Sequence, residues 1–413
     1  MPQRNYSNSW FSRMSNRVDY PLLLPLFFLL LIGGYAVYSA VAQDYPAQLV
    51  SMVGQQVVWI IIGSILAFFL MFFNTKFLWI LSPWLYLLGL GLMVLPLFLY
   101  NPNLVAATGA KNWISIGSSS LFQPSEFMKM AYMLVLARLI VSFQEKQKQH
   151  GLKEDLQLIT WMISVTLPVL FLLYLQKDLG TSLVFIAIFA GLVLISGVSW
   201  KIILPTVLVV ALVLTAFLLL FILPGGTGLL HTLGMDTYKI NRINAWLDPF
   251  RYAQSISYQQ SQSLIAIGSG GLRGTGFEPS NILVPVRESD MIYTVIGENF
   301  GFLGGVLVLT LYGALIYRIL RITFQSKNRF YTYIATGYVM LLVFHIFENI
   351  GAATGLLPLT GIPLPFISQG GSAMIANLLG IGLILSMSYQ NSLQGEKKSK
   401  RKKTHGFRLK KAS

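Results

Sequence analysis

Charged side chains in or beside long apolar runs are the first residues of this sequence that could do chemistry. One such group is the block QPSEFMK at 123–129. Pro124 fits the first turn of a helix, Glu126 lies near the positive end of the helix dipole, and Lys129 follows three residues later on the same face. Charges inside a membrane are costly, so both are functional candidates, with an ion pair that merely closes a helix end as the alternative.

Two further groups are smaller. Asp178, in the block QKDLG at 176–180, stands between two apolar runs and either contributes to a site or caps the next helix. His345 and Glu348 are three residues apart in another apolar run, a spacing that can bind a metal ion. Two ligands without partners are too few for a metal site, so we interpret them as a hydrogen-bonded pair inside a helix bundle.

The block RESDMIYTVIGE at 287–298 joins a long polar segment to an apolar run. Asp290 stands where the run begins, and Glu298 lies just over two helical turns further on, so both face roughly the same side. We take Asp290, Glu298 and the neighbouring Arg287 as site candidates. Capping of the following helix by Asp290, or by Ser289, is the competing interpretation.

Two segments rich in Gly and Pro are expected to depart from regular helix. Residues 358–372 contain three prolines and three glycines, and irregular backbone at membrane depth lines protein or a water-filled cavity. We expect this segment to wall an outward-facing cleft, with Ser368 and Gln369 as substrate-binding candidates. The run GSGGLRGTG at 268–276 matches neither GxxxxGK[ST] nor GxGxxG. A tight turn and an anion pocket lined by backbone N–H groups are both open for it.

The elements that must position these residues are membrane helices. Hydrophobic residues make up 54% of the 413 residues and charged residues 11%, and the mean hydropathy is +0.64. Soluble proteins have roughly 45–50% hydrophobic and 25% charged residues, so a cytosolic enzyme and a disordered chain are both excluded. The chain has no Cys and only four His, which argues against disulfides, thiol chemistry and a multi-His metal cage.

We expect an all-α polytopic membrane protein with ten transmembrane helices, because only helices satisfy their own backbone across lipid over such lengths. The ten apolar runs are 21–40, 52–73, 77–99, 124–143, 158–175, 179–197, 202–223, 291–317, 331–354 and 366–389.

The distribution of Lys and Arg orients the chain. If the N-terminus is cytoplasmic, 22 of the 30 Lys and Arg lie in cytoplasmic segments, as the positive-inside rule requires, and ten spans return the C-terminus to the cytoplasm. The stretch KKSKRKK after Glu396 is interpreted as a tail lying against anionic lipid rather than a nucleic-acid site. Ala40-Val41-Ala42 is similar to a signal-peptidase site, but the apolar run before it is too long, so we expect an uncleaved first helix.

These spans divide the chain into a cytoplasmic tail at 1–20, a transmembrane domain at 21–390 and a basic cytoplasmic tail at 391–413. Two outer segments are long, one at about 100–123 and one at 224–290, which has 67 residues. A loop of that length is rarely a mere connection, so we expect function on the extracellular face of the cell membrane.

Several ordered blocks together resemble the SEDS family, and the resemblance covers nearly the whole chain between its tails. RodA-type members are favoured over FtsW-type members, which usually read HTD where this chain has Glu288-Ser289-Asp290. The blocks are QPSEFMK (123–129), QKDLGTS (176–182), IAIGSGGLRGTGF (265–277), VPVRESDMIYTVIGENFGFLGG (284–305) and GLLPLTGIPLPFISQGGSAMIANLLGIGL (355–383).

The resemblance implies a peptidoglycan glycosyltransferase that polymerises lipid II into β-1,4-linked glycan during cell elongation. The family's catalytic aspartate falls on Asp290, and its pocket positions fall on Glu126, Lys129, Asp178 and Arg242. Many members carry Arg before the Trp of the first long outer loop. Here that position is Asn112, so Lys111 beside it is the substitute candidate.

The chemistry agrees with this expectation. Asp290 can act as the general base on the acceptor hydroxyl, a task worth about 10²–10⁴-fold. Lys129, Lys111, Arg242 or a divalent cation such as Mg²⁺ or Mn²⁺ can stabilise the departing pyrophosphate. No nucleotide is needed, because the substrate carries its own activated leaving group.

The resemblance further implies partners and leaves alternatives. A class B penicillin-binding protein and other membrane proteins of the elongation complex are the expected partners, with no nucleic acid. A lipid II flippase would use the same intramembrane charges but predicts internal repeats and a midplane site, whereas the polar groups gather on the outer face. A non-catalytic scaffold would leave Asp290 and Glu126 without a role.

Overall fold

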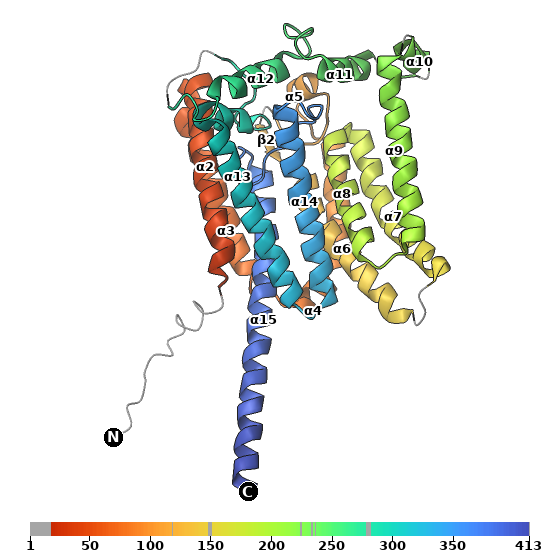
Figure 1. Cartoon of the computed structure of the whole chain (residues 1–413), viewed down its shortest axis with the longest axis vertical. Coiled ribbons are helices and arrows are strands. Elements are labelled where there is room, and N and C mark those ends of the chain that lie inside the picture. Colours follow the sequence, from red (N-terminus) through yellow and green to blue (C-terminus); the bar gives the residue numbers. More distant parts are fainter. Residues whose placement is uncertain are drawn as a thin grey trace.

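The computed structural model describes residues 18–117, 119–147, 151–223, 225–232, 234–235, 237–277 and 282–412. Long helices run side by side as one bundle, with shorter helices lying across one end (Figure 1). The long helices are α2 (Tyr20–Asp44), α3 (Leu49–Leu70), α4 (Thr75–Val94), α6 (Pro124–Lys146), α7 (Leu152–Gln176), α8 (Leu179–Ile195), α9 (Trp200–Ile222), α13 (Ile292–Gln325), α14 (Arg329–Ala353) and α15 (Gly371–Ala412).

The remaining elements are short. They are the 3-10 turns Pro46–Gln48 and Leu95–Leu97, the helices α5 (Pro102–Thr108), α10 (Gly226–Thr232), α11 (Thr237–Leu247) and α12 (Tyr258–Gly270), and an antiparallel hairpin of β1 (Ile114–Ile116) and β2 (Ser119–Phe122). Helices α10, α11 and α12 lie across one end of the bundle, and the start of α2 and the C-terminal end of α15 lie at the other (Figure 1). We call the end with α10–α12 the outer end.

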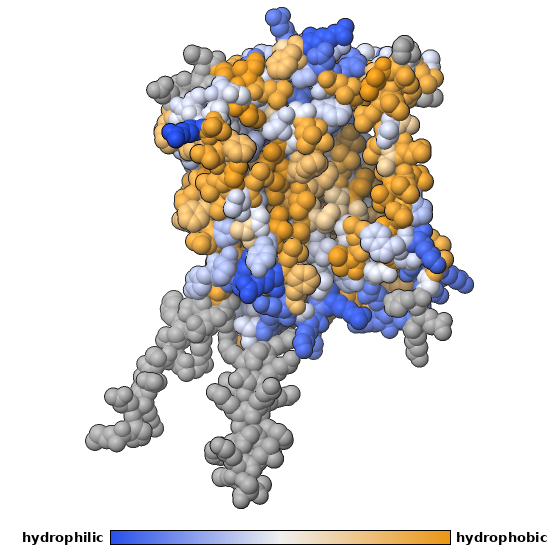
Figure 2. Space-filling view, in the orientation of Figure 1, coloured by the Kyte–Doolittle hydropathy of each residue, from blue (hydrophilic) through white to orange (hydrophobic). Residues whose placement is uncertain are grey.

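The all-α prediction is confirmed, and each of the ten predicted runs falls on a long helix. In the described part of the chain, eight helices are long and apolar enough to cross a membrane, namely α2, α3, α4, α7, α9, α13, α14 and α15. Helix α8 is apolar but has 17 residues, and α6 carries Glu126, Lys129 and Arg138, so the number of ten spans stays a prediction. On the face that Figure 2 shows, an apolar band lies between hydrophilic residues near the two ends of the bundle.

One predicted boundary is wrong. The tenth run was expected to begin at 366, but α15 begins at Gly371, because residues 361–370 form an irregular segment. The backbone of α15 then continues as helix through Ala412, past the start of the predicted basic tail at 391. The division into two cytoplasmic tails and one transmembrane domain depends on how the chain sits in the membrane, and it stays a prediction.

Local sequence explains where several helices begin. Asp19, Asn74 and Asn328 accept hydrogen bonds from the backbone N–H groups of Leu22, Phe77 and Phe330, which lie in the first turns of α2, α4 and α14. These are the side chains that favour the N-cap position. Pro124 opens α6, where its missing N–H costs nothing.

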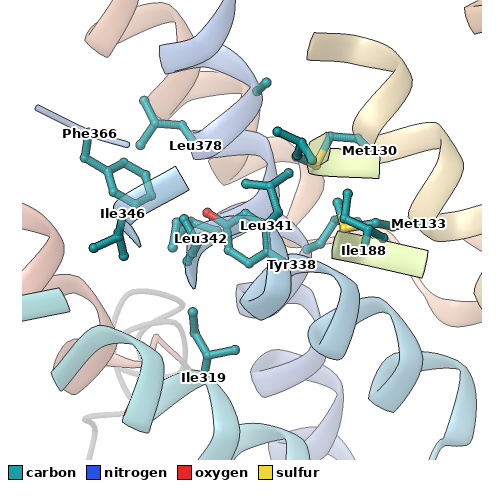
Figure 3. Packing of buried hydrophobic residues seen from close by; sticks show 14 of the residues in the cluster. Met130, Met133, Ile188, Ile319, Tyr338, Leu341, Leu342, Ile346, Phe366 and Leu378 are labelled. Atoms are coloured by element: carbon teal, nitrogen blue, oxygen red, sulfur yellow. The ribbon is translucent and has the colours of Figure 1, made fainter. Parts of the chain in front are cut away.

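The core is built around α14 and α15. Tyr338, Leu341 and Leu342 of α14 pack with Met133 of α6 and Ile188 of α8 (Figure 3). The Tyr338 hydroxyl donates to the carbonyl of Asn377 in α15 at 2.7 Å. Most of α14 is buried, whereas α9 buries only Ile203, so α14 lies inside the bundle and α9 at its edge.

The glycine run at 268–276 packs against a break in α13. Gly301 interrupts that helix with φ 62°, and the backbone N–H of Thr275 donates to the carbonyl of Glu298 at 2.8 Å. A Cβ on Gly274 would lie 2.1 Å from the carbonyl oxygen of Asn299. The run is therefore a close-packed turn that binds backbone groups of the broken helix, as the tight-turn interpretation expects.

Candidate active site

Asp290 lies in an irregular segment, residues 285–291, that leads into α13 at the outer end of the bundle. Its side chain is half-buried. The N-cap position of α13 is Met291, so neither Asp290 nor Ser289 occupies it. Capping by Asp290 or by Ser289, the competing interpretation of this block, is therefore wrong.

Asn349, in the last turns of α14, holds the backbone of Asp290. Its side-chain amide donates to the carbonyl of Asp290 at 2.7 Å and to the carbonyl of Ile362 at 2.9 Å. Residue 362 belongs to the Pro-rich and Gly-rich segment after α14. One buried amide thus joins the segment that carries Asp290 to the segment expected to wall the cleft.

Ser368 and Gln369 strengthen the same connection. The Ser368 hydroxyl donates to the carbonyl of Ser289 at 2.6 Å and accepts from the backbone N–H of Leu364 at 2.8 Å. The backbone N–H of Gln369 donates to the carbonyl of Glu288 at 2.9 Å. These contacts hold Ser368 and the backbone of Gln369 against the residues just before Asp290, and substrate binding by the two residues stays a prediction.

The Asp290 carboxylate has Gly361 and Glu348 as neighbours. A Cβ on Gly361 would lie 3.7 Å from Asp290 Oδ2. Glu348, in the last turns of α14, is close enough to interact electrostatically with Asp290. Its Oε1 accepts hydrogen bonds from both the backbone N–H and the hydroxyl of Thr360, the former at 3.2 Å.

The predicted ion pair of α6 lies inside the bundle. Lys129 Nζ is 2.8 Å from the Glu126 carboxylate, and Lys129 is 1% exposed. Nζ also lies 3.4 Å from Nε2 of His345, whose Nδ1 is 3.3 Å from the carbonyl of Pro363. A carbonyl accepts only, so Nδ1 carries the hydrogen and Nε2 accepts from the ammonium group. His345 therefore contacts Lys129 and Pro363 and makes no pair with Glu348, which corrects our interpretation of those two residues.

Asp178 caps α8, as one of its two interpretations predicted. Its Oδ1 accepts from the backbone N–H of Thr181 at 3.0 Å. Its Oδ2 accepts from the Thr181 hydroxyl at 2.9 Å and from the Asn112 amide at 2.7 Å. Asn112, the residue that departs from the family pattern, therefore ties the first outer segment to the start of α8. The ammonium group of Lys111 lies over the ring of Tyr100, 4.3 Å from its centre.

Arg287 and Glu298 form a buried cluster with the end of α2. The Arg287 guanidinium contacts both carboxylate oxygens of Asp44, at 2.7 and 3.0 Å, and lies 3.7 Å from Glu298 and against Gln43. Beside it, burial raises the pKa of the Glu288 carboxyl, and nearby Asp44 adds to that rise. This cluster anchors residues 285–291 to α2.

Arg242 belongs to α11, but its side chain lies outside the described residues. The position of its helix is clear: α11 crosses the outer end of the bundle (Figure 1). Trp246 donates from its indole nitrogen to the carbonyl of Gly355 at 3.1 Å and so fastens α11 above the end of α14.

Several buried polar atoms have no hydrogen-bond partner in the part of the chain that the structure describes. Buried polar groups in folded proteins nearly always have partners, so each exception needs an explanation such as a bound ligand. In the part of the chain that the structure describes, such atoms include Ser125 Oγ, Glu288 Oε2, Glu348 Oε2 and Asn349 Oδ1. They come from the start of α6, the segment before α13 and the outer end of α14.

A divalent cation finds few ligands among the described residues. No group of three or more His, Asp and Glu side chains that could hold a metal ion is present in them. A cation at this site would therefore complete its shell with substrate oxygens, in the way that Mg²⁺ commonly uses one or two carboxylates plus phosphate.

The chain is similar to known proteins along nearly its whole length. The family model described as "Cell cycle protein", which spans FtsW, RodA and SpoVE, matches residues 20–393. The chain belongs to this family, the SEDS family. It is 30% identical to stage V sporulation protein E of Bacillus subtilis, over 90% of this chain and 96% of that protein. It is 31% identical to the peptidoglycan glycosyltransferase MrdB of Escherichia coli K12, over 90% of this chain and 93% of that protein.

Solved structures agree with the SEDS assignment. The chain matches a protein whose structure is described as "Structural coordination of polymerization and crosslinking by a peptidoglycan synthase complex", with a TM-score of 0.73, 26% identity and coverage of 91% of this chain and 98% of that one. It also matches the rod shape determining protein RodA of Thermus thermophilus, with a TM-score of 0.61, 27% identity and coverage of 90% and 96%. The chain is an integral membrane protein.

Four of the SEDS blocks are connected by contacts. The block at 284–305 carries Asp290, and the block at 355–383, the predicted wall, contacts the residues just before it. The block at 123–129 reaches the same wall, because the backbone N–H of Gln123 donates to Ser372. The block at 176–182 joins it through Gly180, where a Cβ would lie 2.8 Å from the carbonyl oxygen of Thr360. Asn349 and Thr360 were missed as site residues, although a buried Asn beside a Glu in an apolar helix was the available signal.

Proposed function

We propose that this chain polymerises lipid II into β-1,4-linked glycan strands on the outer face of the cytoplasmic membrane, with Asp290 as the general base. Its relatives named peptidoglycan glycosyltransferases support the reaction class. The observation that carries the proposal is the placement of Asp290. It is a half-buried carboxylate just before α13 at the outer end, and Asn349 holds its backbone.

The proposed chemistry divides tasks between two sets of residues. Asp290 takes the proton from the attacking sugar hydroxyl while that oxygen forms the glycosidic bond and pyrophosphate leaves. Lys111 and Arg242 lie on outer segments and are the cations proposed to meet the leaving group, alone or with Mg²⁺ or Mn²⁺. Lys129 is buried and engaged by Glu126 and His345, so we assign it a positioning role between α6 and α14.

The proposed setting is the elongation machinery of the cell wall. The start of α2 and the end of α15 lie at the end opposite to α10–α12 (Figure 1), and the excess of Lys and Arg supports a cytoplasmic position for that end. A RodA-type role is supported by Glu288-Ser289 before Asp290. A class B penicillin-binding protein and other membrane proteins of the elongation complex are the proposed partners. The similarity to a protein from a peptidoglycan synthase complex supports the first of them.

The test is polymerisation of lipid II by the purified chain, co-purified with its cognate transpeptidase. Asp290→Asn keeps the size of the side chain but removes the base, so we expect a loss of at least about 100-fold in glycan synthesis with unchanged yield and melting temperature. Asp155→Asn is the matched control. It neutralises a buried carboxylate that accepts from Ser199 at 2.9 Å beside the start of α9, at the opposite end.

Two results would end the proposal. Wild-type glycan synthesis by Asp290→Asn would remove the general base. A wild-type chain that binds lipid II but forms no glycan, with or without the transpeptidase, would favour a flippase or a scaffold.

A further inference from the structure

Glu348 is a buried carboxyl group that the proposed mechanism does not yet use. It is 3% exposed and lies in the last turns of α14 beside Asp290. Its two oxygens have different surroundings. Oε1 accepts two hydrogen bonds from Thr360, whereas Oε2 has no hydrogen-bond partner and is shielded from solvent.

The charges around Glu348 argue for its neutral form. Asp290 is its acidic neighbour, whereas Lys129, which contacts His345 one turn earlier in α14, is already paired with Glu126. An ionised carboxylate buried without a cation is far more costly than a neutral acid. Asp290 must be ionised to act as a base, which makes a second negative charge beside it still less favourable.

The contacts with Thr360 place the proton of the neutral acid. An oxygen that accepts from both an N–H and an O–H group is the carbonyl oxygen of a carboxylic acid, so Oε1 is that oxygen. The hydrogen then sits on Oε2. Glu348 therefore presents one O–H donor that has no acceptor in the described part of the chain, next to the proposed general base.

A buried donor without an acceptor is less favourable than a paired one. We propose that Glu348 is a substrate-binding residue, whose Oε2–H donates a hydrogen bond to an oxygen of the acceptor sugar that Asp290 deprotonates. Asn349, its chain neighbour, also has a buried atom without a hydrogen-bond partner, Oδ1. Two polar atoms on one turn of α14 are thus available to bind a ligand. The inference rests on the proposed function for the identity of the sugar. Glu348 keeps its proton throughout.

The alternative occupant of this position is a cation. A cation would require ionised Glu348, whereas the proposed hydrogen bond requires only a donor. Gln retains the carbonyl oxygen for Thr360 and replaces the O–H donor by N–H, so Glu348→Gln separates the two possibilities. Glu348→Met fills similar space and removes both polar atoms.

The experiment measures lipid II binding and polymerisation by the full chain with its transpeptidase. Glu348→Met should lower kcat/KM by about 3–10-fold, the value of one neutral hydrogen bond, mainly through KM. It should also reduce the rise in melting temperature that lipid II produces, and it should lower the melting temperature without lipid II, because Thr360 loses the acceptor of two hydrogen bonds. Glu348→Gln should recover at least about half of the wild-type kcat/KM.

Other outcomes overturn the inference. One such outcome is that Glu348→Gln is as impaired as Glu348→Met, and that raised Mn²⁺ increases the activity of the wild type but not of the Gln variant. That outcome would identify a cation site. Full lipid II binding by Glu348→Met would make the residue structural. If Glu348→Met does not fold, Thr360→Val replaces it. That variant removes one of the two groups that orient Glu348, and wild-type lipid II binding by it would equally count against the inference.

The binding measurement keeps this inference apart from the proposed function. A chain that binds lipid II through Glu348 but forms no glycan would contradict the polymerase and leave the role of Glu348 supported. If the wild type forms glycan and its Glu348→Met variant binds lipid II normally, the polymerase proposal is supported and the role of Glu348 is contradicted.

Discussion

At the scale of residues, the site is an arrangement of acids with different environments. Asp290, the proposed base, is half-buried, whereas Glu348 and Glu288 are buried. Carboxyl groups divide tasks when their surroundings push their protonation in different directions. The proposed acid–base chemistry would therefore depend on the neighbours of Asp290 as much as on Asp290 itself.

Glu288 gives a pH prediction. Burial raises its pKa in the folded chain, and nearby Asp44 raises it further. The folded state therefore binds this proton more tightly than the unfolded state, so stability falls as pH rises from the unfolded pKa towards the folded one. Glu288→Gln removes that dependence. We expect its melting temperature to exceed that of the wild type at pH 8 and to match it near pH 4.

The measurement is a series of melting curves in one detergent from pH 4 to pH 8. Asp155→Asn is again the control for a buried carboxylate elsewhere. A Glu288→Gln variant that is less stable than the wild type at pH 8 would show that the carboxylate, rather than the acid, is the form the fold favours.

At the scale of elements, two breaks in helical structure shape the outer end. Helix α13 is interrupted at Gly301, where the run at 268–276 supplies hydrogen bonds to its backbone. The segment between α14 and α15 is irregular and connects to the residues before Asp290. Irregular backbone is stable at such depth only where its polar groups find hydrogen-bond partners. The run at 268–276 provides partners for α13, and the segment after α14 provides them for the residues before Asp290.

Gly274 tests the first of these breaks. Its φ is +81°, and a Cβ there would lie 2.1 Å from the carbonyl oxygen of Asn299. Gly274→Ala should therefore destabilise the chain by more than about 1 kcal/mol, seen as a lower melting temperature and yield. Gly268, in the same run, has ordinary helical backbone and open space around it. Gly268→Ala should be neutral or slightly stabilising. Equal melting temperatures for the two variants would contradict the packed turn.

At the scale of the whole molecule, orientation determines whether the site meets its substrate. The bundle places α10–α12 and Asp290 at one end and the start of α2 at the other (Figure 1). The chain has no native Cys, so single-Cys variants report topology without background. A membrane-impermeant thiol reagent added to intact cells should label Tyr252→Cys and should reach Lys402→Cys only after the membrane is opened. The opposite pattern would put Asp290 in the cytoplasm and remove the proposed function.

Sequence by itself determined the features that depend on short-range pattern. Apolar runs of membrane length located all ten long helices, because burial in lipid is decided by local composition. The spacing of Glu126 and Lys129 determined their pairing, since residues three apart in a helix lie on one face. Tertiary structure decided the rest. Asn349 meets Asp290 across 59 positions and Asn112 meets Asp178 across 66, and no periodicity connects residues so far apart. His345 turned towards Lys129 and Glu348 towards Thr360, because a buried polar side chain takes the partner that packing brings within reach.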